Sequence, residues 1–216
     1  MVKVIIFDFD YTLGDSTKGI VLSVNYALER LGYGAKEDED IKRTIGLSLK
    51  DTFFALTDKN DLKEAELFAN YFKDKADDVM VENTVLYENV KETLLKLKDN
   101  GYKIGIVTTK FHYRIEQILF KYDADKLVDV IVGAEDVKVE KPNPEGLLWA
   151  IDYFGVDKSE VLYVGDSIVD AKTAENADVN FVAVLTGTTT RDEFAGYNNV
   201  CVCKNILNVY KYALKI

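Results

Sequence analysis

The chain has 216 residues, of which 48% are hydrophobic and 30% charged, and its formal net charge is −10. This length suits one large domain, or a medium-sized domain with a smaller insertion, of ordinary globular composition. The acidic balance argues against a nucleic-acid partner, which would need a clustered basic face, and no polybasic patch indicates a membrane partner. The short apolar run at the N-terminus is too short for a signal peptide or a membrane span.

The first predicted strand covers residues 4–7 and ends in two carboxylates, Asp8 and Asp10, followed by Thr12. Side chains two residues apart lie on the same side of an extended chain. Two carboxylates so close repel by roughly 4 kcal/mol at an effective dielectric near 20. A strand core has no structural need for such a pair at its carboxyl end, where open α/β sheets bind their ligands. A metal ion with an anionic substrate would need it.

The stretch that follows breaks the α/β rhythm, because it contains helical patterns and no convincing strand. About seventy residues are too many for a loop. We therefore expect a helical cap domain, residues 15–84, inserted into a core domain made of residues 1–14 and 85–216. Its hinges, near residues 13–17 and 82–87, should let it close as a lid over substrate. Its predicted helices are residues 20–31, 41–45, 49–56 and 62–79.

The remaining chain alternates strands with helices, which predicts an α/β fold: a Rossmann-like, doubly wound, mostly parallel sheet. An amphipathic helix through Val90 and Leu97 opens this part, and we expect Trp149 on a buried helix face. The two cysteines, Cys201 and Cys203, are two residues apart on one strand and cannot easily bridge, which favours buried thiols in the reducing cytoplasm. The predicted strands are residues 103–108, 128–133, 161–165, 181–185 and 200–203, and the helices are 111–121, 144–154, 168–177 and 205–214.

Four polar segments fall at or just beyond the carboxyl ends of these strands, and such ends converge on one crevice of a doubly wound sheet. Four carboxylates gathered there would not all ionise stably without a cation. Oxygen-only ligands favour Mg²⁺ over zinc or copper. Lys141 would add a fixed positive charge and Thr108 a neutral donor, a set suited to phosphoryl transfer. The acidic candidates are Asp8, Asp10, Asp166 and Asp170.

These segments, in this order, resemble the haloacid dehalogenase superfamily of phosphohydrolases over nearly the whole chain. The resemblance rests on Asp8 and Asp10 with Thr12, on Thr108 after a strand, on Lys141-Pro142, and on Gly165-Asp166 followed by Asp170. Residues 45–49 and 101–110 are most similar to the phosphoglycolate phosphatases and the bacterial pyrophosphatases allied to them. The inserted helices resemble the small helical cap of that family.

The resemblance implies a mechanism in which Asp8 attacks phosphorus and Asp10 serves as acid and base. It also implies that Thr108 and Lys141 hold phosphate oxygens and that Lys141 restrains Asp8. The implied Mg²⁺ ligands are Asp8, the backbone carbonyl of Asp10, Asp166, and Asp170 directly or through water. Thr109, Arg43 and Lys50 are further candidates for substrate binding. The family usually has glycine after Asp10, whereas this chain has Tyr11, whose ring we expect to narrow the leaving-group pocket.

The leading hypothesis is a Mg²⁺-dependent phosphatase of a small phosphorylated metabolite such as phosphoglycolate, working through an aspartyl phosphate. The alternatives are an inorganic pyrophosphatase, a β-phosphoglucomutase-like phosphoryl transferase, and a non-catalytic binding protein on the same fold. A mutase is disfavoured because its cap histidine has no counterpart before His112, which itself is expected at the surface of a helix start. A dehalogenase or phosphonate hydrolase would lack Asp10. The substrate, and the choice between monomer and homodimer, stay open.

Overall fold

The computed structural model describes residues 1–197 and 200–216, and it divides into two compact units. The first unit joins Met1–Asp15 to Leu86–Ile216, and the second is Ser16–Val85. We call them the core unit and the cap unit. Their boundaries lie one residue after those expected from the sequence.

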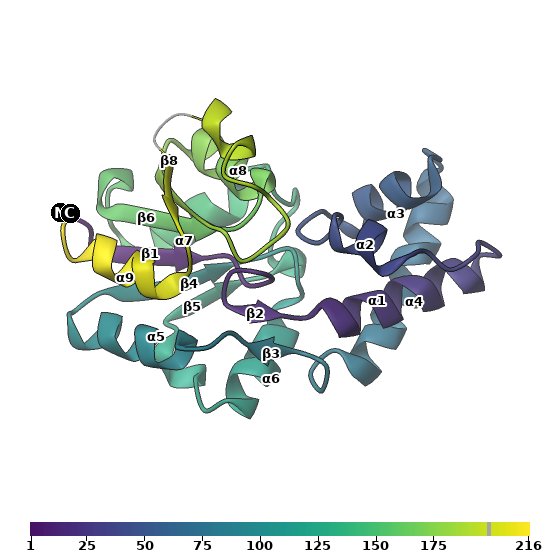
Figure 1. Cartoon of the computed structure of the whole chain (residues 1–216), viewed down its shortest axis with the longest axis horizontal. Coiled ribbons are helices and arrows are strands. Elements are labelled where there is room, and N and C mark those ends of the chain that lie inside the picture. Colours follow the sequence, from purple (N-terminus) through teal and green to yellow (C-terminus); the bar gives the residue numbers. More distant parts are fainter. Residues whose placement is uncertain (198–199) are drawn as a thin grey trace. The chain divides into compact units, whose positions relative to one another are not determined.

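The core unit contains a six-stranded, fully parallel sheet in the order β5-β4-β1-β6-β7-β8 (Figure 1). The central strand β1 pairs on both sides, so that Phe7 lies opposite Ile106 of β4 and Val164 of β6. All of its side chains are fully buried, which explains why its sequence is uniformly apolar. The predicted α/β fold is therefore confirmed. The strands are β1 (Val4–Phe7), β4 (Lys103–Val107), β5 (Val130–Val132), β6 (Val161–Gly165), β7 (Asn180–Val184) and β8 (Val200–Cys203).

Helices cover both faces of this sheet (Figure 1). The helices α5 and α9 contact each other, and α5 packs on β4 while α9 packs on β7 and β8. The helices α7 and α8 also contact each other, with α7 on β4 and β5 and α8 on β6 and β7. The helices are α5 (Val90–Asp99), α6 (His112–Lys121), α7 (Glu145–Phe154), α8 (Ile168–Ala177) and α9 (Ile206–Ala213), with short 3₁₀ turns at Asp125–Leu127, Ala134–Asp136, Lys158–Glu160 and Glu193–Gly196.

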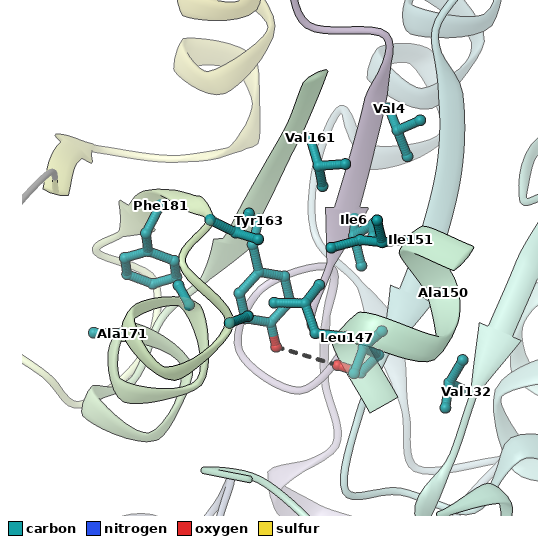
Figure 2. Packing of buried hydrophobic residues seen from close by; sticks show 14 of the residues in the cluster. Val4, Ile6, Val132, Leu147, Ala150, Ile151, Val161, Tyr163, Ala171 and Phe181 are labelled. Carbon is teal, nitrogen blue, oxygen red and sulfur yellow. Dashed lines mark hydrogen bonds between the residues drawn. The ribbon is translucent and has the colours of Figure 1, made fainter. Parts of the chain in front are cut away.

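The hydrophobic core beneath α7 and α8 is formed by buried side chains of the sheet and of both helices (Figure 2). Val4 and Ile6 of β1 pack with Leu147 and Ile151 of α7, and each such buried aliphatic side chain contributes about 1.5–3 kcal/mol. The ring of Tyr163 lies in the same cluster, and its hydroxyl oxygen lies 3.4 Å from the carbonyl oxygen of Val107. The hydroxyl oxygen of Tyr163 therefore lies at the boundary of this core, beside Val107, the last residue of β4.

The expectation that Trp149 is buried was wrong, because 51% of its surface is exposed. The face of α7 that packs on the sheet is formed by Leu147, Ala150 and Ile151. Trp149 lies off this face and stacks on Tyr153, with ring centroids 5.8 Å apart. Apolar character alone therefore placed this side chain on the wrong face.

The cap unit consists of four helices in the described residues, α1 (Thr17–Arg30), α2 (Asp38–Lys42), α3 (Leu49–Thr57) and α4 (Leu62–Val79). The helix α4 packs against α1 and α3. Its own core includes Leu28, Phe53 and Phe68, all fully buried. Asp61 begins α4, because its side chain accepts hydrogen bonds from the backbone of Lys63 and Glu64. The periodicity of the sequence predicted all four helices.

The sequence did not reveal the two short strands β2 (Gly14–Asp15) and β3 (Val85–Leu86), which pair as a separate sheet. Strands of two residues carry no readable alternation of polar and apolar side chains. None of the helices in residues 1–197 and 200–216 has the length and apolar character that crossing a bilayer requires.

Candidate active site

The ends of β1 and β4 fix the backbone of two candidate residues. The backbone N–H of Asp8 donates to the carbonyl oxygen of Val164 at 2.8 Å, and that of Thr108 donates to Val132 at 3.0 Å. These bonds continue the sheet by one residue beyond each strand. Both side chains are nearly buried, at 3% exposure for Asp8 and 5% for Thr108.

A tight loop after β1 carries Asp10 and Thr12. The carbonyl oxygen of Phe9 accepts hydrogen bonds from the backbone of Thr12, Leu13 and Gly14. Within this loop Tyr11 has φ of 59°, in the left-handed region that glycine adopts at the lowest cost. The loop geometry accounts for the preference for glycine at this position in the family that the sequence resembles. The hydroxyl of Thr12 donates to Asp166 Oδ1 at 3.1 Å, linking the loop to the end of β6.

Lys141 lies at the centre of the acidic cluster. Its Nζ is 2.7 Å from Asp8 Oδ1, 2.7 Å from Asp170 Oδ1 and 3.2 Å from the hydroxyl oxygen of Tyr163. Burial opposes the charge of Lys141, but the charges of Asp170 and Asp8 outweigh it and raise the pKa of Lys141 well above its usual value. Lys141 therefore stays protonated and restrains the carboxylate of Asp8.

The start of α8 orients Asp170. Ser167 precedes the helix, and its hydroxyl accepts from the backbone N–H of Asp170 while Asp170 Oδ2 accepts from the backbone and hydroxyl of Ser167. The other oxygen, Oδ1, accepts from Lys141 and from the Tyr163 hydroxyl at 2.9 Å. Both oxygens of Asp170 are thus engaged by protein donors.

The carboxylates of Asp8, Asp166 and Asp170 fit a divalent cation. One oxygen from each lies within 4.8 Å of the others, and all three residues are buried. Burial raises the pKa of Asp8 to about 7, although the charge of Lys141 limits the rise. Burial, and then the charges of Asp170 and Asp8, raise the pKa of Asp166 well above its usual value.

A single lysine leaves this cluster short of positive charge, and a hard cation with oxygen ligands would supply it. Asp8 and Asp166 each have one oxygen held by Lys141 or Thr12, which leaves the second oxygen of each as a ligand. Because both oxygens of Asp170 are engaged, its contribution fits a role through Lys141 or water better than direct coordination.

Sequence reasoning missed two features of this cluster. Tyr163 lies in the middle of the apolar strand β6, where the sequence pattern indicates only a packing role. The second is Gly187, beyond β7, where a Cβ atom would lie only 1.8 Å from Asp166 Oδ2. The absence of a side chain at Gly187 therefore makes room for the carboxylate of Asp166. No spacing or pattern in the sequence signals this contact.

The segment after β4 holds the remaining core candidates. Thr108 Oγ1 accepts from the backbone N–H of Lys110 at 3.2 Å, and its own proton can still be donated to a phosphate oxygen. Lys110 Nζ lies 3.1 Å from Asp10 Oδ2, and no pattern in the sequence predicts this ion pair. Thr109 is half-buried beside them.

Arg43 and Lys50 lie in the cap unit, at the end of α2 and in α3, and both are exposed. Their role in substrate binding stays a prediction. His112 begins α6, where Nδ1 lies 2.9 Å from Asp136 Oδ2. It borders a cavity of about 670 Å³ formed with β5 and Trp149, and the acidic cluster does not line that cavity.

Residues 5–184 match the family model of the haloacid dehalogenase-like hydrolases, and the chain belongs to this family. Among curated relatives, pyrophosphatase PpaX of Bacillus mycoides is 36% identical over 183 residues, covering 85% of this chain and 83% of the relative. A crystal structure assigned to haloacid dehalogenase-like hydrolases, from Bacteroides fragilis, is 43% identical with a TM-score of 0.94, covering 97% of this chain and all of the other. A structure from Clostridium acetobutylicum, 23% identical with a TM-score of 0.92 over both whole chains, shares the fold.

We expect Tyr163→Phe to lower kcat/KM for hydrolysis by about 10–100-fold, the usual effect of losing a hydrogen-bond partner in the outer shell of a metal site. The change removes the hydroxyl that donates to Asp170 and accepts from Lys141, while the buried ring stays. Steady-state kinetics and a thermal melt would check it. Tyr153→Phe, at an exposed position, is the matched control. Unchanged kinetics in Tyr163→Phe would show that Lys141 and Ser167 suffice to hold Asp170.

Proposed function

We propose that the chain is a Mg²⁺-dependent phosphatase that removes a phosphoryl group from a small anionic substrate through an aspartyl phosphate on Asp8. The observation that carries the proposal is the position of Lys141, whose ammonium group contacts both Asp8 and Asp170 beside Asp166. A cluster of this kind holds a nucleophilic carboxylate in place and leaves room for a cation. Membership of the hydrolase family supports the same reaction class.

In the first step an oxygen of Asp8 forms a bond to phosphorus while the bond from phosphorus to the leaving oxygen breaks. Asp10 gives its proton to that leaving oxygen. In the second step Asp10 takes a proton from water, the water oxygen attacks phosphorus, and the bond from phosphorus to Asp8 breaks. Phosphate leaves, and both carboxylates return to their starting states.

The phosphoryl oxygens need positive charge and hydrogen-bond donors throughout this sequence. Lys141 supplies a permanent charge, and the hydroxyl of Thr108 supplies a neutral donor. When bound, Mg²⁺ would be held by Asp8 and Asp166, with Asp170 and the backbone carbonyl of Asp10 nearby, and would neutralise phosphoryl charge. We propose that the substrate is also bound by Thr109 of the core unit. Arg43 and Lys50 of the cap unit are further proposed contacts.

Two substrates deserve the first test. Phosphoglycolate follows from the resemblance of the sequence to phosphoglycolate phosphatases. Pyrophosphate is supported by the curated relatives, since pyrophosphatase PpaX proteins from several Bacillus species are 33–36% identical to this chain. We place pyrophosphate first because that support comes from matches covering 85% of the chain.

The test is phosphate release from a panel containing pyrophosphate, phosphoglycolate, a sugar phosphate and a nucleoside monophosphate, with Mg²⁺ and with a chelator. We expect Mg²⁺-dependent release that is fastest with pyrophosphate. Faster release from phosphoglycolate would overturn the order of the two substrates and keep the mechanism. Failure to hydrolyse any of them, including p-nitrophenyl phosphate, would overturn the phosphatase proposal and favour a non-catalytic protein.

A further inference from the structure

Lys110 pairs with the carboxylate that the proposed mechanism uses as acid and base. Its Nζ lies 3.1 Å from Asp10 Oδ2, and the exposed fractions of the two side chains are 5% and 10%. A lysine is rarely this buried unless it is paired. The pair therefore has a more defined geometry than the ion pairs at the surface of the core unit.

The two oxygens of Asp10 have different surroundings. Oδ2 faces Lys110, whereas Oδ1 is buried and has no hydrogen-bond partner among the described residues. An unpartnered buried carboxylate oxygen is costly, and it is retained where a ligand or a reacting group completes the site. The orientation of Asp10 thus reserves Oδ1 for a partner that is not part of the protein.

The backbone places Lys110 for this contact. Its N–H donates to Thr108 Oγ1, in a turn that directly follows β4. The same turn therefore positions the hydroxyl proposed to bind the phosphoryl group and the ammonium that holds Asp10. Lys141 already contacts the nucleophile Asp8, so the two lysines serve two different carboxylates.

We propose that Lys110 is a positioning residue that holds Asp10 by Oδ2, so that Oδ1 delivers the proton to the leaving oxygen and later receives the proton of the attacking water. This inference rests on the proposed phosphatase function. It adds a residue that acts on the acid–base step and leaves nucleophilic attack and phosphate binding to Asp8, Thr108 and Lys141.

The acid–base step matters most for poor leaving groups, which gives a specific test. A phenolate needs a proton as it departs, whereas p-nitrophenolate departs readily without one. We expect Lys110→Met to lower kcat/KM for phenyl phosphate by about 10²-fold, the order expected from a small misplacement of a catalytic group. The same variant should lower kcat/KM for p-nitrophenyl phosphate by less than about threefold, because this ratio does not include hydrolysis of the aspartyl phosphate, a step that is common to both esters and also uses Asp10.

Two further variants separate positioning from other roles. Asp10→Asn should show the same selective loss of activity on phenyl phosphate, and adding Lys110→Met to it should cost little more, because residues acting as one unit are not additive. Lys96→Met is the matched control: Lys96 also pairs with a carboxylate, Glu92, at 2.6 Å, but on the exposed surface of α5. It should leave both rates unchanged.

Equal losses of kcat/KM on the two esters, or a rise in KM without a change in kcat on both, would overturn the inference and show that Lys110 supports the fold or binds substrate. If wild-type protein with Mg²⁺ hydrolyses neither ester and none of the panel substrates, the proposed function itself is wrong and the inference fails with it. A wild type that is active on both esters distinguishes the first failure from the second.

Discussion

Asp8→Asn is expected to lower kcat by at least about 10⁴-fold, the order lost when the nucleophile of a covalent mechanism is removed. The amide cannot form the acyl phosphate that the proposed first step requires. Its shape is nearly that of the carboxylate, and its Oδ1 can still accept from Lys141, which also keeps its contact with Asp170. The loss should therefore appear in kcat, with the thermal midpoint of unfolding unchanged or higher.

The measurement combines phosphate release with mass spectrometry of protein quenched during turnover. Wild type should carry one added phosphoryl group on the peptide containing Asp8, and the variant should carry none. Asp178→Asn is a suitable control, because Asp178 is an exposed residue at the end of α8 with φ of 59°, a conformation that asparagine also tolerates. A variant that kept more than about one hundredth of the activity would assign the nucleophile to another group.

The strand ends that hold Asp8, Thr108 and Asp166 were predictable because each follows a buried apolar run. The change from apolar to polar residues marks the end of each strand, and in a parallel sheet all carboxyl ends lie on one edge. The helices of the cap unit were equally readable from their periodicity. Lys141 is different, since it lies in a loop and only the resemblance to a known family indicated its partners.

The contacts that sequence reasoning missed depend on packing between segments far apart in the chain. Tyr163 is surrounded by apolar residues in its own strand, and only the turn of α8 brings Asp170 to its hydroxyl. Gly187 matters because of Asp166, a residue of another strand end. Lys110 follows Thr109 in the sequence, but the contact of its side chain with Asp10 depends on the turn in which its backbone N–H donates to Thr108 Oγ1. Local sequence patterns predict helices and strands, whereas these contacts depend on the register of the strands and on the conformation of the loops.

The stability of the metal-free protein should fall as pH rises, and Mg²⁺ should reverse the fall. The pKa of Asp8 is about 7 in the fold, above the ordinary value, and that of Asp166 is also raised, in both cases chiefly by burial. A carboxyl group whose pKa is raised by folding stabilises the fold while it is protonated, and this stabilisation is lost as pH climbs from the unfolded pKa through the folded one. We expect metal-free protein to melt at a lower temperature at pH 8 than at pH 6.

Asp166→Asn tests which charge is responsible. The amide cannot ionise at any pH and can still accept from Thr12, so the metal-free variant should lose less stability than wild type as pH rises. A difference of about 1.5 kcal/mol at pH 8 would raise its melting temperature by about 3–6 °C, given about 2–4 °C per kcal/mol in a chain of this size. Glu175→Gln removes an equal charge from an exposed site on α8 and should leave the midpoint nearly unchanged. This control separates the buried cluster from the general repulsion of an acidic chain.

Mg²⁺ should raise the melting temperature of wild type more than that of Asp166→Asn. Mg²⁺ at about one hundred times its dissociation constant stabilises a protein that binds it by about 2.7 kcal/mol, which corresponds to a rise of about 5–10 °C for wild type. Asp166→Asn should gain little, because it has lost one of the two carboxylates with an oxygen left to coordinate the ion. Calorimetric melts of wild type and Asp166→Asn at pH 6 and pH 8, each with Mg²⁺ or with a chelator, would measure these differences in melting temperature. If wild type and Asp166→Asn gained equally from Mg²⁺, the cation would bind elsewhere, and the raised pKa values of this cluster would need another explanation than a metal site.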